Sequence, residues 1–278
     1  MSTITASDGV RLYYESQGAG TPVVFVHEFA GSCRSFDLQM DVFRASHRSI
    51  AFNARGYPPS DVPDAVESYS QDVAAMDIVA VLDGLGIERS HLVGVSMGAA
   101  SALQVAIKHP RRVLSATLAS IGTGSDAKPG ESEAAMEAMA RLIDGQGLSG
   151  LAASMGNSPS RRRLKEKIPA EYERFMEQLG TLSASGMANT MRGVQKRRPP
   201  IYAHETSLAQ VRAPVLIILG GDDAGCRGAS EFLQRKLPRA RLEEFPHTGH
   251  LVNIEEAERF NNLVLPFIDL VDAEAQRR

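Results

Sequence analysis

Short apolar segments alternate with amphipathic segments along the first 120 residues of the chain. Apolar, β-branched runs predict strands, and segments whose apolar residues recur every three or four positions predict helices. The predicted strands cover residues 10–15, 22–27, 48–53, 91–95 and 113–119, and the predicted helices cover 36–47, 68–84 and 97–109. Ser68, followed three residues later by Gln71, is expected to cap the second helix. Such alternation is typical of an α/β fold with a mostly parallel sheet and helices on both faces.

The alternation stops after Gly122. Residues 125–205 show long helical patterns without a clear buried strand. Strands are again predicted at 214–219 and 241–245, and a closing helix at 255–270.

The expected organisation is therefore one α/β core formed by residues 1–124 and 206–278, interrupted by a helical insertion at 125–205. A long inserted segment with its own structure is more often a lid or cap than a passive linker.

A G-x-S-x-G sequence, Gly94 to Gly98, lies between a predicted strand and an Ala-rich predicted helix. In that setting the turn is too sharp for large flanking side chains, and it exposes the serine, here Ser96, above the sheet. The N–H of Met97 and the positive end of the helix would then face a developing oxyanion. The alternative is an ordinary serine in a tight turn.

A serine nucleophile needs a base that is held in place by a third group. In this type of fold the acid and the histidine follow the serine in chain order, each after a later strand. Asp222 and Asp223 follow the strand predicted at 214–219, and His247 and His250 follow the strand at 241–245. His250 is favoured over His247 because Gly249 lets the loop turn tightly toward the sheet edge.

Composition narrows the classes of function. The chain has 30 Lys and Arg against 33 Asp and Glu, a formal charge of −3, which argues against a nucleic-acid partner held by a broad basic surface. No apolar run approaches the roughly 18 residues of a membrane span, and the N-terminus lacks the pattern of a secretory signal. We therefore expect a cytoplasmic protein without a membrane partner, whose Cys33 and Cys226 are free thiols. No metal-ligand spacing is present, so neither a metal nor a cofactor is expected.

Taken together, these motifs resemble the α/β-hydrolase superfamily, in particular its small capped esterases, enol-lactonases and carbon–carbon bond hydrolases. The resemblance covers nearly the whole chain and is weakest at 125–205. It also includes the segment 55–60, which is similar to the family's RGxGxS loop. The family pattern assigns the acid to Asp223, with Asp222 as the alternative, and implies that the Phe29 N–H is the second oxyanion donor beside Met97. His27 corresponds to a buried histidine that organises the loop.

Glu28 departs from the family pattern, which usually has glycine after this histidine. A glutamate disfavours positive φ, and it could place a carboxylate near the site. The favoured interpretation is instead that Glu28 points away and pairs with Arg34 or Arg55.

The insertion is expected to contribute to the substrate pocket. Methionines adapt to irregular apolar ligands, although most methionines simply pack in a core. The candidate pocket residues are Glu28, Met136, Met139, Met187 and Leu251. The basic run at 161–167 is interpreted mainly as a solvated helix face, and alternatively as a means of steering an anionic substrate.

The predicted function is hydrolysis of a small-molecule carboxylic ester or lactone through an acyl-enzyme on Ser96. His250 is the predicted base and Asp223 the orienting acid. The alternatives are a carbon–carbon bond hydrolase acting on a vinylogous diketone, a cysteine nucleophile, and a non-catalytic ligand-binding protein of the same fold. By resemblance, the carbon–carbon hydrolases often carry a Trp beside the histidine, and this chain has no Trp. The sequence does not define the oligomeric state, and a homodimer is one of the alternatives.

Overall fold

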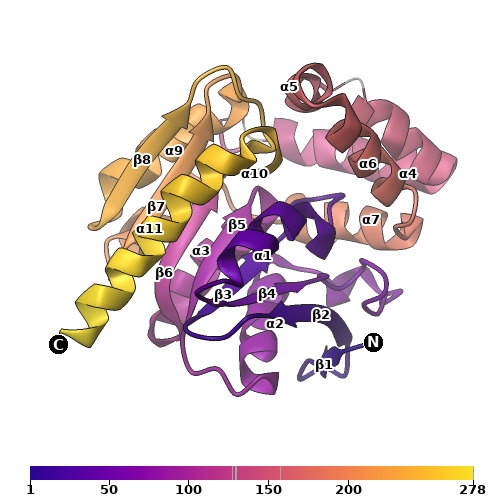
Figure 1. Ribbon diagram of the computed structural model, residues 1–278. Helices are drawn as coiled ribbons and strands as arrows, with labels where there is room; N and C mark the ends of the chain where they lie inside the picture. Colours follow the sequence, from indigo (N-terminus) through magenta and orange to yellow (C-terminus); the bar gives the residue numbers. More distant parts are fainter. Residues whose placement is uncertain (127, 129, 157, 278) are drawn as a thin grey trace.

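The computed structural model of the protein describes residues 1–126, 128, 130–156 and 158–277 (Figure 1). Within these residues eight strands form one sheet in the order β1-β2-β4-β3-β5-β6-β7-β8. The strands are β1 (Thr3–Thr5), β2 (Arg11–Gln17), β3 (Pro22–Val26), β4 (Arg48–Phe52), β5 (Ser90–Val95), β6 (Val113–Ala119), β7 (Val215–Gly220) and β8 (Ala240–Phe245). The pairs β1–β2 and β2–β4 are antiparallel and all the others are parallel. The mostly parallel sheet predicted from the sequence is thus confirmed.

Helices cover both faces of the sheet, as the apolar runs of the strands require. Along β3, Val23 and Phe25 join the hydrophobic cluster under one face, and Val24 and Val26 join the cluster under the other. The first face is covered by α1 (Asp37–Phe43) and α11 (Ala257–Gln276), and the second by α2 (Gln71–Gly84), α3 (Met97–Lys108) and α9 (Ala224–Lys236). Most strand residues are therefore buried from both sides, and the site lies beyond the strand ends.

Between β6 and β7 the described residues form helices and turns only. The longer helices are α4 (Glu131–Gly156), α5 (Pro159–Lys167), α6 (Pro169–Leu179) and α7 (Ala184–Thr190), followed by the π-helical turn η4 (Met191–Gln195), the 3₁₀ turn η5 (Ile201–His204) and α8 (Glu205–Leu208). Figure 1 shows α4 to α7 gathered at one end of the molecule. There α5 contacts the short helix α10 (Val252–Glu255), which follows β8.

Several element boundaries differ from the sequence prediction. The helix predicted from Ser68 begins at Gln71, because the hydroxyl of Ser70 accepts the Val73 N–H at 3.1 Å and Ser70 is the N-cap. Ser68 instead closes the short 3₁₀ helix η2 (Val66–Ser68). The helix predicted at 36–47 corresponds to α1, which ends earlier, at Phe43, and the 3₁₀ helix η1 (Cys33–Phe36) directly precedes it. Strand β1 and helix α9 were not predicted, and a further 3₁₀ turn, η3 (Pro110–Arg112), precedes β6.

No helix within the described part of the chain combines the length and the apolar character needed to cross a bilayer.

A buried ion pair joins the loop after β4 to α2. The guanidinium of Arg55 donates to both carboxylate oxygens of Asp77, at 2.8 and 2.6 Å, and both side chains are almost fully buried. Arg55 also contacts Asp8, whose side chain is 47% exposed. The next residue upstream, Ala54, donates its N–H to His27, so this ion pair supports the loop that begins the candidate site.

We predict that Asp77→Ala lowers the free energy of unfolding by about 3–5 kcal/mol, because it leaves the buried Arg55 charge without its bidentate partner. Asp8→Ala, which removes a half-exposed partner of the same guanidinium, should cost about 1 kcal/mol or less. Urea unfolding followed by circular dichroism measures both values, and equal losses in the two variants would contradict the prediction.

Candidate active site

Ser96 occupies the sharp turn between β5 and α3. Its φ of 53° and ψ of −111° are strained for a residue with a side chain. A Cβ at Gly94 would come within 2.5 Å of the Gly98 backbone, and a Cβ at Gly98 would collide with the carbonyl oxygen of Val26. Only glycine fits at either position, which explains the spacing of the motif. The turn leaves Ser96 partly exposed at the N-terminus of α3.

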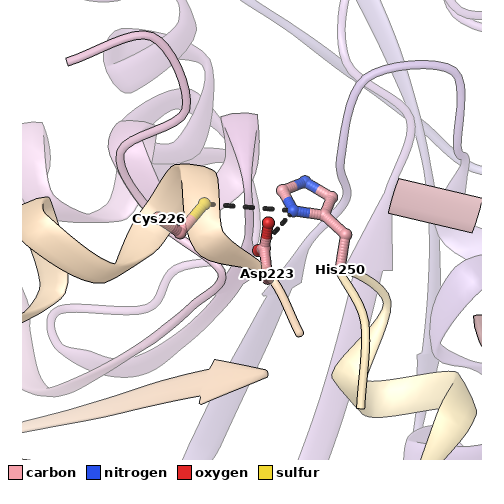
Figure 2. A group of neighbouring side chains, drawn as sticks. All are labelled: Asp223, Cys226 and His250. Carbon is pink, nitrogen blue, oxygen red and sulfur yellow. Dashed lines mark hydrogen bonds and ion pairs between the residues drawn. The ribbon is translucent and has the colours of Figure 1, made fainter. Parts of the chain in front are cut away.

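His250 and Asp223 meet at the same edge of the sheet. Asp223 follows β7, His250 follows β8, and the Nδ1 of His250 lies 2.7 Å from Oδ2 of Asp223 (Figure 2). Burial acts to raise the pKa of Asp223, but the charge and hydrogen bond of His250 outweigh it and leave that pKa below its usual value. Both described side-chain contacts of His250 are made by Nδ1, and Nε2 has no partner among the described residues.

The two alternative residues lie elsewhere. The carboxylate of Asp222 forms an ion pair with Arg163 at 2.5 Å. His247 is exposed and has a positive φ of 55°. The geometry therefore favours Asp223 and His250 over their neighbours.

The loop after β3 lies beside the Ser96 turn, because β3 and β5 are parallel neighbours with Val26 opposite Gly94. The loop is organised by His27, which contacts the Glu28 carbonyl oxygen through Nδ1 at 2.7 Å and accepts the Ala54 N–H through Nε2 at 3.1 Å. Burial lowers the pKa of His27 to about 4, so the ring is neutral and acts as a structural connector. Phe29 follows within this loop, as Met97 follows Ser96, so both residues lie at the same sheet edge.

A family model described as alpha/beta hydrolase fold matches residues 21–257 of the chain, which includes the serine turn, the acid and the histidine.

The chain belongs to the α/β-hydrolase family.

Three similar proteins illustrate the range of this family. A 2-hydroxy-6-oxononadienedioate/2-hydroxy-6-oxononatrienedioate hydrolase of Paraburkholderia phymatum is 30% identical over 288 residues, covering 93% of this chain and 91% of the relative. The 3-oxoadipate enol-lactonase 1 of Acinetobacter baylyi is 27% identical over 268 residues, covering 95% and 96% of the two chains. The solved structure of Est816, described as an N-acyl homoserine lactone degrading enzyme, is 27% identical with a TM-score of 0.79, and covers 96% of this chain and all of that one. This chain is accordingly an enzyme of the α/β-hydrolase superfamily, whose substrate the family alone does not define.

Glu28 does not point away from this hydrolase's site, and its predicted pairing with Arg34 or Arg55 is wrong. Arg34 is bound by Glu15 and Asp37, and Arg55 by Asp77 and Asp8. Glu28 is 1% exposed, and its Oε1 accepts the Ser35 hydroxyl at 3.0 Å. The positive φ of the loop falls on Ala30, at 62°, so Glu28 carries no such strain.

The electrostatic surroundings of Glu28 include the site histidine. Burial raises the pKa of the Glu28 carboxyl, against the opposing charges of Arg161 and His250 and the Ser35 hydrogen bond. Its Oε2 is buried and has no hydrogen-bond partner among the described residues. Glu28 is thus a buried acid in the loop that carries Phe29, and it interacts electrostatically with His250.

Most of the basic run at 161–167 is a solvated helix face, as the sequence analysis favoured, because Arg162, Lys165 and Lys167 are exposed, but Arg161 is buried. Arg161 is 3% exposed, lies 4.9 Å from the Phe175 ring centre, and interacts electrostatically with Glu28, Glu255 and Asp223. Arg163 pairs with Asp222, and Lys167 with Glu256. Helix α5 is therefore docked by its cations onto the loops that carry the acid and the histidine.

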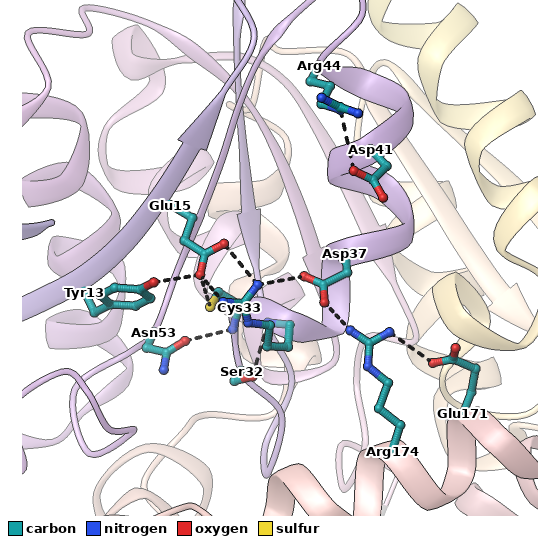
Figure 3. Close-up of polar contacts among 11 residues, drawn as sticks. Tyr13, Glu15, Ser32, Cys33, Asp37, Asp41, Arg44, Asn53, Glu171 and Arg174 are labelled. Carbon is teal, nitrogen blue, oxygen red and sulfur yellow. Dashed lines mark hydrogen bonds and ion pairs between the residues drawn. The ribbon is translucent and has the colours of Figure 1, made fainter. Parts of the chain in front are cut away.

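A second docking contact joins α6 to the segment after the Phe29 loop. Figure 3 shows Arg174 of α6 between Glu171 and Asp37, and Asp37 also contacts Arg34, which reaches Glu15 of β2. The helices between β6 and β7 are thus tied to the core by ion pairs on two sides.

Glu255 is a site residue that the sequence analysis missed. Its two carboxylate oxygens accept the N–H groups of Gly249 and Leu251, at 2.6 and 3.1 Å, so that it holds the backbone on both sides of His250. It is 4% exposed. The available signal was its position five residues after His250, directly after the mostly apolar residues 251–254.

The two thiols are poor candidates for a nucleophile. Burial and the Asp223 charge raise the pKa of Cys226 well above its usual value, and burial raises the pKa of Cys33 to about 12. A reactive cysteine needs the opposite shift.

The predicted pocket residues share one hydrophobic cluster with Phe29 and Met97. Met187 and Leu251 are fully buried, and Met136 and Met139 are partly buried on α4. Their contact with a substrate stays a prediction.

We predict that Glu28→Gln lowers the midpoint of the acid limb of the rate–pH profile, because it removes a carboxylate that interacts electrostatically with His250. Hydrolysis of an activated phenyl ester between pH 5 and 9 measures the midpoint. Glu15→Gln, which neutralises a carboxylate bound to Arg34 instead, should leave it unchanged. An unchanged midpoint in Glu28→Gln would contradict the prediction.

Proposed function

We propose that the protein is a serine hydrolase that cleaves a carboxylic ester or a lactone through an acyl-enzyme. The observation that carries the proposal is the 2.7 Å contact between His250 Nδ1 and Asp223, made at the same edge of the sheet as the strained turn that exposes Ser96. That arrangement supplies a base with a fixed tautomer and a nucleophile on the same sheet edge. The names of the enol-lactonase and the lactone-degrading relative support the same substrate class.

The mechanism begins with attack of the Ser96 hydroxyl oxygen on the substrate carbonyl carbon. His250 takes the hydroxyl proton on Nε2, while Asp223 holds the Nδ1–H and stabilises the imidazolium. The negative charge that develops on the carbonyl oxygen is stabilised by the N–H groups of Phe29 and Met97. The imidazolium then gives its proton to the leaving alkoxide, which for a lactone stays attached as a hydroxyl group.

Deacylation repeats the same steps with water. His250 removes a proton from the water as it attacks the acyl-enzyme, and returns it to the Ser96 oxygen when the ester bond breaks. Glu255 acts on this step indirectly, because it fixes the loop on both sides of His250. No group beyond the chain, the substrate and water enters the proposed scheme.

Residues 125–205 are proposed to act as a cap over a core formed by 1–124 and 206–278. The support is the docking of α5 on the two loops that bear Asp223 and His250. The expected partner is a small ester-like molecule, which enters between α5 and the sheet edge when these contacts open.

We predict that a fluorophosphonate probe labels the peptide containing Ser96, and that Ser96→Ala abolishes the label.

Matched pairs of variants test the proposed roles of His250 and Asp223. His250→Ala and Asp223→Asn should lower kcat by about 10⁴-fold or more, whereas His247→Ala and Asp222→Asn should keep most of it. Peptide mass mapping and steady-state hydrolysis of ester and lactone panels provide the measurements.

Two outcomes would contradict this proposal. If the folded protein is not labelled and turns over no ester or lactone, the non-catalytic binding protein is favoured. If labelling persists in Ser96→Ala, another residue is the nucleophile.

A carbon–carbon bond hydrolase is the second candidate, and one observation favours it. Arg161 is a buried cation from α5 close to the catalytic face, where it could bind a substrate carboxylate. The Paraburkholderia relative is named for cleaving dioates.

For this candidate, we predict that Arg161→Gln raises KM for a carboxylate-bearing vinylogous diketone by roughly tenfold to a hundredfold, the loss of a charge-assisted hydrogen bond of about 1.5–3 kcal/mol. KM for a neutral ester should change little. Arg162→Gln, at the exposed neighbouring position, is the matched control. Equal effects on both substrate types would remove the support for this candidate.

A further inference from the structure

We propose that Asp223, Cys226 and His250 form a binding site for a thiophilic divalent cation such as Zn²⁺, and that occupation of this site stops catalysis. The metal site stands on geometry alone, whereas the loss of catalysis rests on the proposed function of His250. Figure 2 shows the three side chains converging, Cys226 from the first turn of α9 and His250 from the loop after β8.

The three residues offer nitrogen, oxygen and sulfur donors to one point. His250 Nδ1 lies 2.7 Å from Asp223 Oδ2 and 3.9 Å from Cys226 Sγ, and the three donor atoms lie within 4.8 Å of one another. Within the described part of the chain this is the one group of three or more such residues that meets this distance. Histidine, carboxylate and thiolate are the usual zinc ligands, and a catalytic-type zinc site has three protein ligands with one position left open.

The spacing fits a tetrahedral ion with a small adjustment. Bonds of about 2.1 Å to nitrogen and about 2.3 Å to sulfur place those two atoms about 3.6 Å apart at a tetrahedral angle, close to the 3.9 Å observed. The nitrogen and oxygen ligands would separate from 2.7 Å to about 3.4 Å. Occupation therefore requires the Asp223 carboxylate and the imidazole to separate by about 0.7 Å.

The position of Cys226 is fixed by its own contacts. Its Sγ donates to the Ser120 carbonyl oxygen at 3.3 Å and lies 3.3 Å from the Thr123 hydroxyl, and the residue is fully buried. The sulfur is thus held beside the imidazole in the absence of any ion. Cys33 is also buried, with its Sγ 4.0 Å from a carboxylate oxygen of Glu15, and none of its described contacts is with an imidazole, so it offers a matched control.

Charge balance favours a divalent ion. Asp223 contributes one negative charge, and the Cys226 thiol contributes a second when its proton is released to solvent, so the occupied site carries no net charge. Burial of an uncompensated charge would be costly, and this site avoids it. The nearby Arg161 charge opposes the ion, and Glu28 and Glu255 offset that charge.

Occupation would remove the catalytic base. The proton that Nδ1 shares with Asp223 moves to Nε2 when the ion takes Nδ1, so the imidazole remains neutral. Nε2 then carries a hydrogen and has no lone pair for the Ser96 proton. The hydrolase would be inactive until the ion is withdrawn.

The test uses Co²⁺ as a spectroscopic probe and Zn²⁺ as its competitor, on the full-length protein. Co²⁺ bound to a thiolate gives a sulfur-to-metal charge-transfer band in the near ultraviolet, which needs no catalysis to be seen. We expect one equivalent of Co²⁺ to produce the band, Zn²⁺ to bleach it, and Zn²⁺ to suppress fluorophosphonate labelling of Ser96 until a chelator is added.

Three variants assign the ligand. Cys226→Ser and Cys226→Ala should lose the band and raise the Zn²⁺ concentration for half-inhibition by about a hundredfold, since even an outer-shell change costs about 10- to 100-fold in metal affinity. Cys33→Ser should behave as the wild-type protein. Circular dichroism and Ser96 labelling without metal verify that each variant is folded.

The proposal is overturned if the wild-type protein gives no band, if the band survives in both Cys226 variants, or if Cys33→Ser removes it. A failure of the proposed function gives a different experimental result. In that case Ser96 is not labelled even without metal, while the Co²⁺ band and its dependence on Cys226 remain.

Discussion

Two backbone contacts without room for a side chain hold the site of this α/β-hydrolase together. At Gly98 the helix after the serine turn packs against the Val26 carbonyl at the end of β3, so close that a Cβ would collide with it. At Gly220 the end of β7 packs in the same way against the Gly249 carbonyl, directly before His250. The first contact fixes Ser96 against the loop that carries Phe29. The second fixes Asp223 against the loop that carries His250, and the 2.7 Å contact between their side chains depends on it.

The site also contains several buried charges, and their arrangement limits the free-energy cost of burying them. Glu28, Glu255 and Asp223 are acids at the sheet edge, and Arg161 brings one cation among them from α5. An isolated buried charge is strongly unfavourable, whereas a compensated group with hydrogen bonds is tolerated. Glu255 meets this condition with two backbone N–H groups and Asp223 with His250. Glu28 meets it least well, since one of its oxygens has no hydrogen-bond partner among the described residues.

Much of the fold was accessible from the sequence because its signals are local. The apolar runs at 22–27 and 214–219 predict buried strands, and the serine turn joins a strand directly to a helix with a glycine on each side of the turn. The choice of Asp223 over Asp222 came from resemblance alone, and the geometry agrees with it through the contact to His250. Local reasoning failed at the helix start, where Ser70 and Ser68 offer the same hydroxyl and only the backbone geometry decides between them.

The charged partners of Glu28 and of the basic run could not be predicted from the sequence, because they lie far along the chain. Asp222 is 59 residues from Arg163 and Glu256 is 89 residues from Lys167, and Glu28 interacts with Arg161 and His250 from distant segments. Arg34 and Arg55 are nearer to Glu28 in the sequence, but they form ion pairs with Asp37 and Asp77. The role of the 161–167 segment depends on where α5 docks, which no local pattern encodes. From the sequence, Cys226 was expected only to be a free thiol, because its distance to the imidazole depends on how β7 and β8 pair.

Helix α5 connects three parts of the site that the chain supplies separately. Arg163 contacts Asp222 beside the acid, Lys167 contacts Thr248 and Glu256 around the histidine, and Arg161 acts on Glu28 in the loop after β3. A movement of α5 therefore changes the electrostatic surroundings of the acid, the base and the Phe29 loop together. Most of these contacts join a cation to a carboxylate. They weaken when water enters, because water has a higher dielectric constant than the protein interior. If α5 belongs to a cap, as proposed, opening the entrance to substrate also loosens the loops that carry Asp223 and His250, and closing α5 restores both.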